Sequence, residues 1–209
     1  MLIFIRMNAT NIIEIPGLIT QKISQTVVFN TDGLVVQKKS HFTPATFLPA
    51  ANIAAFRYGV SWLRGYKFVF GHQYFIEVQS YDRKISRIKL GSYYGIRKEV
   101  YGKLWNDIIQ QLWQNYFVNL FNYYHDLYKI HQAFELCGIS FHVDGIGWGQ
   151  QNILPWHQIA ISSYSTYFMI YNSQNKKQCK SKSFANDWNA VILQVLLKEI
   201  VKERNVMLS

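Results

Sequence analysis

The sequence of 209 residues has only two cysteines and four prolines, and no uninterrupted apolar segment that could span a bilayer. A disulfide-rich secreted fold is therefore excluded, and a membrane-spanning helix, which needs about 20 apolar residues, is not expected. Residues 1–6 have their only charge behind the apolar run and lack a small-residue cleavage site, so they do not predict a secretory signal. We expect a cytoplasmic protein with reduced thiols at Cys137 and Cys179.

Acidic side chains are also scarce, since the sequence has 12 Asp and Glu against 22 Lys and Arg, for a net charge of +10. Residues 37–103 hold twelve basic and three acidic side chains, whereas residues 104–175 hold one basic and four acidic. Apolar residues make up 49% of the chain and aromatic residues 16%, which is enough to build a core. The charge pattern predicts a positive first half that attracts anions.

A long amphipathic segment runs from Val100 to Ile130, with one glycine and no proline. Its apolar residues recur at spacings of three and four, which places them on one side of a helix, and aromatic residues widen this stripe. Such a helix would measure roughly 45 Å, more than the width of a small domain. We expect its second half, Tyr116–Tyr128, to bury aromatic side chains such as Phe117 and Phe121 against the C-terminal part of the chain or a second molecule.

The chain contains an internal repeat, detected as three pairs of similar blocks in the same order. They are residues 27–34 and 139–146, 47–54 and 153–160, and 105–112 and 188–195. Three blocks in one order predict the duplication of a domain. We expect an N-terminal arm or lead-in strand at 1–20, a first copy at 21–130 and a shorter second copy at 131–209.

Matching residues anchor this alignment in each copy. They are Asp32, Gly33, Pro49 and Trp105 in the first copy, and Asp144, Gly145, Pro155 and Trp188 in the second. Asp-Gly between two β-rich runs predicts a hairpin with a type I′ turn, in which both central residues have a positive φ. Trp105 and Trp188 are expected to be buried at equivalent places in two helices, the second of which has Asn186 or Asp187 as its N-cap.

Each copy is therefore expected to consist of antiparallel strands followed by one amphipathic helix. This order, with Ile-Ala blocks at Ile53 and Ile159 and a tryptophan near the start of each helix, resembles the pleckstrin-homology-like (PH-like) fold. The whole chain resembles a bacterial tandem PH-like protein. The resemblance implies an α+β protein in which an antiparallel sheet forms an open barrel capped by a C-terminal helix, with the copies joined through the long helix. Two features depart from the family pattern, because the second copy is short of the usual seven strands and the first helix is unusually long.

The resemblance also implies a non-catalytic binding or scaffold module, because PH-like domains mostly bind phosphoinositides, peptides or other proteins. The candidate surface is a basic stretch made of Arg83, Lys84, Arg87, Lys89, Arg97 and Lys98. Alternate residues of a strand point to the same side, so Arg83, Arg87 and Lys89 would share one face, opposite Ile88 and Leu90. The stretch is either an anion-binding surface or a solvated face that maintains solubility.

A protein or an anionic lipid headgroup is the expected partner, ahead of nucleic acid, because few aromatic residues are interleaved with these basic ones for base stacking. The long helix also offers a contact for a homo-oligomer.

Motifs that carry chemistry are missing from the sequence. It has no Cys-x-x-Cys pair, no glycine-rich phosphate loop and no Ser-His-Asp arrangement, so we expect no catalytic residue, no metal and no cofactor. The alternative is an enzyme with a histidine-containing site between the two copies. His142, His157 and Cys179 are then the candidates, since a Cys–His dyad can act as a nucleophile.

Overall fold

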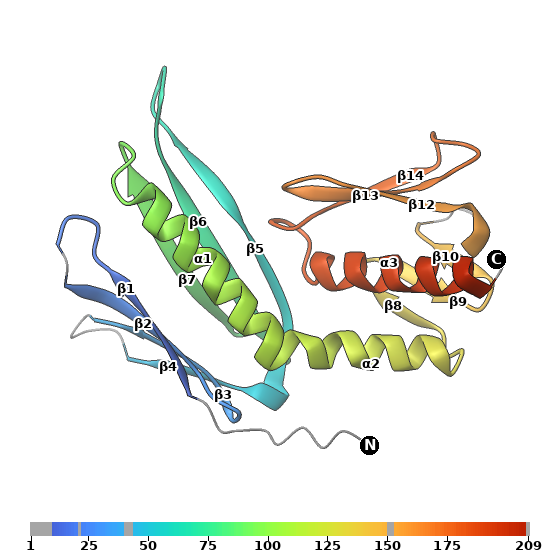
Figure 1. The fold of residues 1–209 in the computed structure, drawn as a ribbon, viewed down its shortest axis with the longest axis horizontal. Helices are drawn as coiled ribbons and strands as arrows, with labels where there is room; N and C mark the ends of the chain where they lie inside the picture. Colours follow the sequence, from blue (N-terminus) through green and yellow to red (C-terminus); the bar gives the residue numbers. More distant parts are fainter. Residues whose placement is uncertain (1–9, 21, 40–43, 150–152, 208–209) are drawn as a thin grey trace. The chain divides into compact units, whose positions relative to one another are not determined.

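The computed structural model describes residues 10–20, 22–39, 44–149 and 153–207, and its fold is a mixed α+β arrangement with four small antiparallel sheets (Figure 1). The chain divides into two compact units, which we call unit 1 (residues 1–117) and unit 2 (residues 118–209). Within the described ranges, no helix combines the length and apolar character needed to cross a membrane.

Unit 1 contains two antiparallel sheets that follow the order of the chain. The first holds β1 (Asn11–Pro16), β2 (Ile23–Phe29), β3 (Gly33–Lys38) and β4 (Thr46–Pro49). A short 3₁₀ turn, η1 (Ala50–Asn52), leads into the second sheet of β5 (Ile53–Arg64), β6 (Val69–Ser80) and β7 (Ile85–Tyr93). The N-terminal strand that was expected within residues 1–20 is thus β1, which pairs with β2, while residues 1–9 lie outside the described residues.

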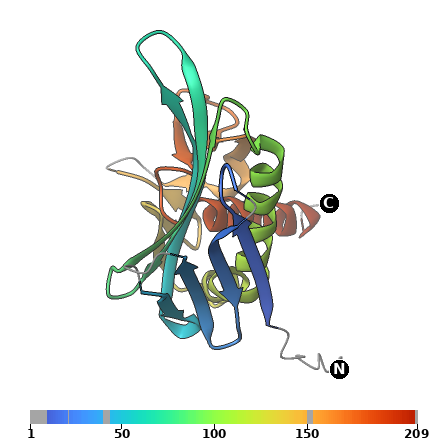
Figure 2. The ribbon, with the colours of Figure 1, turned by 90° about the vertical axis from the view of Figure 1, so that its left-hand side faces the viewer.

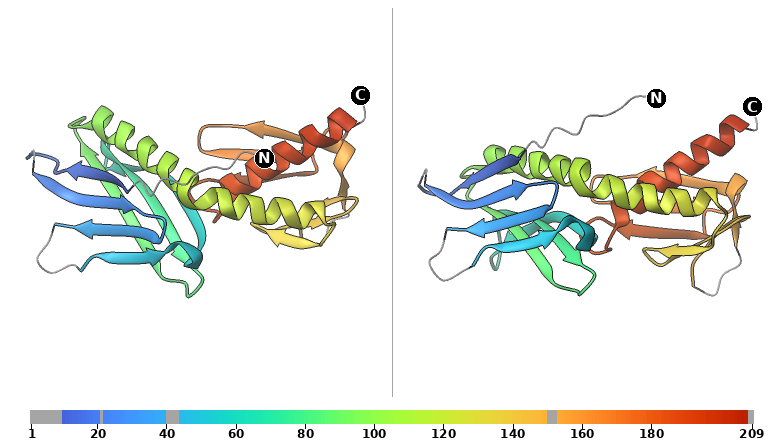
Figure 3. Two further views of the ribbon diagram at one scale, coloured as in Figure 1. Left: turned by 60° about the horizontal axis from the view of Figure 1, so that its bottom comes forward. Right: turned by 90° about the horizontal axis from the view of Figure 1, so that it is seen from below.

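Three consecutive helical segments follow these sheets: α1 (Lys98–Leu112), the π-helix η2 (Trp113–Phe117) and α2 (Val118–Lys129). Figures 1 and 3 show α1 lying along the opening between the two sheets of unit 1. From α1, Tyr101 Oη donates to Pro16 O of β1 (2.9 Å) and Trp105 Nε1 to Phe75 O of β6 (3.1 Å), and from η2, Tyr116 Oη donates to Asn30 O in the β2–β3 turn (2.9 Å). The helical run therefore fixes both sheets, because each bond satisfies a backbone carbonyl.

The division between the units falls inside the helical run, after Phe117, and not after residue 130. Phe117 is fully buried and stacks face to face on Phe56 of β5, so it belongs to the core of unit 1. The expectation that Phe117 packs on the C-terminal part of the chain is therefore wrong. Phe121, one helical turn later, stacks instead on His125 within α2 of unit 2.

Unit 2 also has a four-stranded sheet, a 3₁₀ turn, a three-stranded sheet and a helix. The first sheet holds β8 (Phe134–Leu136), β9 (Ile139–His142), β10 (Gly145–Gly147) and β11 (Leu154–Pro155). After η3 (Trp156–Gln158) come β12 (Ile159–Ser163), β13 (Tyr167–Asn172), β14 (Cys179–Ser183) and α3 (Ala190–Met207). Unit 2 thus has seven strands, and the expectation that it falls short of seven is wrong, because strands of two to four residues leave no alternation to detect.

The helix of unit 2 begins later than the sequence predicts. Asp187 does not cap it, since Asp187 Oδ2 accepts a hydrogen bond from Ser183 N (2.8 Å) and closes the turn after β14. Trp188 therefore precedes the first residue of α3, whereas Trp105 lies inside α1, so the two tryptophans are not at equivalent helical positions, and both are half-buried. The apolar face of α3 is fully buried at Ile192, Leu193, Leu196, Leu197 and Ile200.

The two Asp-Gly pairs form the same junction in both units. Gly33 pairs with Pro49, and Gly145 pairs with Pro155. A Cβ on Gly33 would lie 2.2 Å from Leu48 O, and a Cβ on Gly145 would lie 2.1 Å from Leu154 O. The glycines are thus needed because the next strand approaches too closely for a side chain.

The residues before these glycines do not form the expected turn type. Asp32 and Asp144 are the second residues of two-residue loops closed by the pairs Asn30–Gly33 and His142–Gly145. Neither aspartate has a positive φ, so the prediction of a type I′ turn is wrong. Each aspartate carbonyl accepts the first backbone N–H of the following 3₁₀ turn, from Ala50 (2.8 Å) and Trp156 (3.2 Å) respectively.

Candidate functional site

The strand β7 alternates as the sequence predicts. Ile88 and Leu90 are buried on the face of the sheet that packs against α1, whereas Arg87 and Lys89 are exposed on the opposite face. Arg83 lies in the turn before β7, with a left-handed backbone (φ 63°), and is exposed. Of the basic stretch, the sheet therefore brings Arg87 and Lys89 to one face.

Arg87 is not a free cation on this face, because it belongs to a row of charges across three strands. Glu77 of β6 is 7% exposed, pairs in register with Arg57 of β5 and Arg87 of β7, and accepts from both guanidinium groups. The N–O distances are 2.7 Å to Arg57 and 2.8 Å to Arg87. The carboxylate offsets one of the two positive charges, so the row keeps a net charge of +1, and each oxygen of Glu77 accepts from one guanidinium group.

Two other residues of the basic stretch have structural partners. Lys84 Nζ lies 2.8 Å from Asp82 Oδ2 in the β6–β7 turn. Hydrogen bonds from Lys84 and from the Ser80 hydroxyl lower the pKa of Asp82 to about 2. Arg97, which has a left-handed backbone before α1, donates from Nε and Nη2 to the carbonyl oxygens of Leu18 and Thr20 at 3.0 Å each. Arg97 therefore holds the β1–β2 loop.

Lys98 does not share the face of Lys89. It is the first residue of α1, which packs on the other side of the sheet through contacts of Trp105 with Tyr58 and Tyr74. Among the residues that the structure describes, Arg83, Lys89 and Lys98 make no ion pair. The basic stretch thus supplies three exposed charges without a carboxylate partner, on more than one side of unit 1.

A group of exposed aromatic side chains lies at the end of the β5–β6 hairpin, and the sequence prediction missed it. Figures 1 and 2 show this hairpin projecting past the start of α1. We call residues 62–70 together with Tyr94 and Ile96 of the β7–α1 loop the hairpin tip. Its exposed fractions are 61% for Trp62, 96% for Tyr66, 60% for Phe68 and 76% for Tyr94. The signal in the sequence was WLRGYKFVF, in which aromatic residues flank a glycine and two basic residues without any acidic one.

The base of the hairpin tip is ordered by packing. Phe70 stacks on Tyr93, with ring centroids 6.3 Å apart, and the N–H of Tyr94 donates to Phe70 O (2.8 Å). His72 lies buried between Trp62 and Tyr74, and burial, with a smaller contribution from Lys98, lowers the pKa of its imidazole. His72 is therefore neutral at pH 7 and adds no charge to the hairpin tip.

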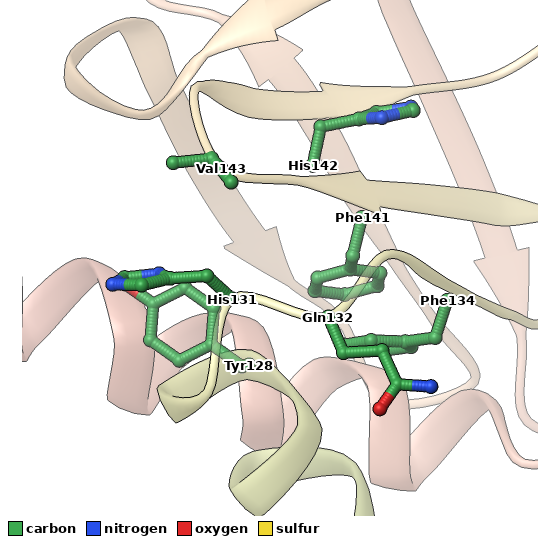
Figure 4. Close-up of a pocket in the computed structure, with 7 residues that line it drawn as sticks. All are labelled: Tyr128, His131, Gln132, Phe134, Phe141, His142 and Val143. Atoms are coloured by element: carbon green, nitrogen blue, oxygen red, sulfur yellow. The ribbon is translucent and has the colours of Figure 1, made fainter.

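Unit 2 has a shallow hollow with a volume of about 10 Å³, far below the range typical of small-molecule sites (Figure 4). It is lined by Tyr128, His131, Gln132, Phe134, Phe141, His142 and Val143. Figure 4 shows the imidazole rings of His131 and His142 pointing in different directions.

The guanidinium of Arg204 in α3 lies over the rings of Tyr128 and Trp156, and its carbon is 5.6 Å and 5.1 Å from their centroids. This cation–π contact fixes α3.

The candidate Cys–His dyad is not assembled in unit 2. Cys179 of β14 pairs with Tyr171 of β13, and β13 lies between β14 and β12, the strand that follows His157. Cys179 is exposed, and among the described residues it forms no hydrogen bond with His157 or His142. Within the described ranges, no cluster of three or more His, Cys, Asp or Glu side chains could hold a metal ion.

Comparison with known proteins gives no family for the chain, since no family model, curated protein or solved structure matches it.

Proposed function

We propose that this protein is a non-catalytic binding module made of two PH-like copies that arose by internal duplication and are joined through the helical run of residues 98–129. The observation that carries the proposal is the repeated order of elements, four strands, a 3₁₀ turn, three strands and a helix, in each unit. The shared junction at Gly33–Pro49 and Gly145–Pro155 supports the same alignment that the sequence repeat gives. The free thiols Cys137 and Cys179 support a cytoplasmic location.

The module binds an anionic partner, a protein or a lipid headgroup, through the outer face of the β5–β6–β7 sheet. Lys89 is an exposed charge of this face, Arg83 is an exposed charge of the turn that leads into β7, and the Arg57–Glu77–Arg87 row keeps a net positive charge. Such a face raises the local concentration of anions within about a Debye length, roughly 8 Å at physiological salt. Binding is therefore weak and sensitive to salt.

The test compares charge reversals in the two units. Arg83→Glu with Lys89→Glu should abolish retention on heparin beads and on polyglutamate at low salt, whereas Lys180→Glu of unit 2, also at an exposed lysine, should change it little. Arg87 is left intact because a glutamate there would stand beside Glu77 and destabilise the sheet. Equal retention of the double variant and the wild type, or no retention of the wild type at low salt, would remove the proposal.

Two further assays separate the alternatives. Retention of duplex DNA in preference to polyglutamate would favour a nucleic-acid partner. Light scattering across a range of protein concentrations would detect a homo-oligomer formed through the helical run.

A further inference from the structure

We infer that the hairpin tip inserts into the interfacial layer of an anionic lipid bilayer. The inference rests on the proposed function and names its partner as a membrane surface. Trp62, Tyr66, Phe68 and Tyr94 are the side chains that enter the layer, and Arg64 and Lys67 lie among them to contact lipid phosphates.

The chemistry of the hairpin tip suits this layer better than water. Trp and Tyr concentrate at membrane–water interfaces, because their apolar rings and polar edges match the headgroup region. The stacking of Phe70 on Tyr93 orders the base of the hairpin before binding, which lowers the entropy cost of insertion. Core packing does not require the four exposed rings, since each is at least 60% exposed.

The charges of unit 1 permit approach to an anionic surface. The sequence from Tyr58 to Ile76 has no acidic residue, and neither does the sequence from Arg83 to Lys98, which carries Tyr94 and Ile96. An anionic leaflet attracts basic residues near its surface, so Arg64 and Lys67 add to the attraction that comes from burying the aromatic rings. Lys67 Nζ lies 5.6 Å from the centroid of the Tyr66 ring, which places this charge beside the most exposed aromatic side chain.

The shape of the hairpin tip argues against a protein partner as the first choice. A stable protein interface buries about 800 Å² on each side, on a broad surface. The β5–β6 hairpin, which makes up most of the hairpin tip, is two strands wide with strands about 4.8 Å apart, and it projects from the unit. A narrow hairpin that projects from the unit and carries aromatic and basic side chains can instead be surrounded by the lipids of the interfacial layer.

The experiment measures sedimentation of the full chain with vesicles of phosphatidylcholine and phosphatidylserine, and with vesicles of phosphatidylcholine alone. The double variant Tyr66→Ser with Phe68→Ser should lower the apparent partition coefficient at least about tenfold, because two rings no longer leave water. The matched control is Tyr81→Ser, which removes a 67% exposed tyrosine at the opposite end of β6 and should leave partitioning within about twofold. Circular dichroism checks that each variant is folded.

A second measurement reports on the hairpin tip directly. An environment-sensitive fluorophore on Tyr66→Cys, with Cys137 and Cys179 replaced by Ser, should shift its emission to the blue when anionic vesicles are added. The same label on Tyr81→Cys should not shift.

The outcomes separate the inference from the function on which it rests. Wild-type protein that is retained on heparin and polyglutamate but does not sediment with either vesicle would overturn the membrane inference and leave the anion-binding function standing. Sedimentation that is unchanged in the Tyr66→Ser, Phe68→Ser variant, with no spectral shift at position 66, would overturn it as well, because another surface would then bind the vesicles. Loss of sedimentation in that variant alone, with a blue shift at position 66, is the expected result.

Discussion

Units 1 and 2 share an order of elements but differ in the length of their second hairpin. β5 and β6 have 12 residues each, whereas β12 has five and β13 has six. The half of β5–β6 next to η1 carries the buried apolar residues, such as Phe56 and Val78, and the shorter β12–β13 hairpin buries Phe168 and Ile170 in the same way. The apolar core therefore needs only the short version, which is why we propose a binding role for the extension in unit 1.

The two units also differ in charge, and unit 1, which has the longer hairpin, is the more basic. Unit 1 holds residues 37–103 with their twelve basic side chains, whereas unit 2 begins at residue 118, inside the segment 104–175 that has one basic and four acidic side chains. In unit 2 the strand β14 contributes Lys182, which is buried and lies 3.3 Å from Asp187, so this lysine is structural. Unit 1 thus combines the longer hairpin with the larger excess of basic over acidic residues, 14 against six compared with eight against six in unit 2, which is why we propose that it binds the partner.

The largest effect is expected from breaking the core at the end of unit 1. Phe117→Ala should lower the free energy of unfolding of unit 1 by about 3–5 kcal/mol, because it removes a fully buried ring that stacks on Phe56. Phe121→Ala, at a half-buried position of unit 2, should cost less. Hydrogen exchange of peptides from β5–β7 and β12–β14 measures the two units separately, and equal loss of protection in both would show that they unfold as one.

A smaller effect tests whether the junctions of the two units are equivalent. Gly33→Ala and Gly145→Ala should each destabilise their own unit by about 1–3 kcal/mol, since the added Cβ meets a strand carbonyl at a distance that real atoms do not adopt. Gly95→Ala is the control, because a Cβ there meets nothing within 4 Å, although its φ of +78° adds strain. Urea denaturation monitors the change, and a tolerated substitution at only one junction would break the proposed alignment of the copies.

The third-largest effect on stability is expected from the Arg57–Glu77–Arg87 row, which belongs to unit 1. Glu77→Gln should cost about 1–2 kcal/mol, because Arg57 and Arg87 lose their shared charged acceptor while both guanidinium groups remain partly in water. Glu99→Gln, at an exposed position of the first turn of α1, should change stability by only a few tenths. Thermal denaturation compares the two, and equal midpoints would mean that the Arg57–Glu77–Arg87 row has no net stabilising effect.

The sequence predicted the class of fold because its strongest signals are local. The antiparallel strands, the helix around Trp105 and the outward side of Arg87 and Lys89 follow from alternation and helical spacing, which each segment carries in itself. The short strands β10 and β11 could not be predicted, since three or two residues are too few to show a period. The alignment of Trp188 with Trp105 in the sequence repeat also predicts the wrong helix position, because α3 begins two residues after Trp188.

The candidate site was harder to predict because it depends on pairing between strands. Glu77 is one charge in an apolar strand until the register places it between Arg57 and Arg87. Likewise, Arg97 resembles any basic residue before a helix, and its bonds to Leu18 and Thr20 span nearly 80 positions of the chain. Register and long-range contacts are set by the whole unit, so a scan along the chain detects the charges without their partners.

The smallest effect concerns the turn that joins the last two strands of each unit. In unit 1, the Ser80 N–H donates to Lys84 O (3.0 Å), and Asp82 accepts bonds inside the turn. In unit 2, the Asn172 N–H donates to Gln178 O (2.9 Å) at the same place, and the neutral side chain of Asn172 accepts the bonds inside the turn. Each turn is closed by a backbone bond and ordered by a side-chain acceptor, although the turn of unit 2 is two residues longer, and the acceptor of unit 1 is titratable whereas that of unit 2 is not.

This difference predicts that acid loosens the β6–β7 turn and not the β13–β14 turn. The pKa of Asp82 is lowered from 3.8 to about 2, so its contribution is fully present above about pH 4 and is lost as the pH falls through about 2. Amide chemical shifts of Ser80 and Lys84 should follow this titration, while those of Asn172 and Gln178 should stay constant. Asp82→Asn should abolish the transition at Ser80, because an amide side chain cannot ionise in this range. A simultaneous shift at all four amides would instead indicate acid unfolding of the whole protein, and it would refute the contrast between the two turns.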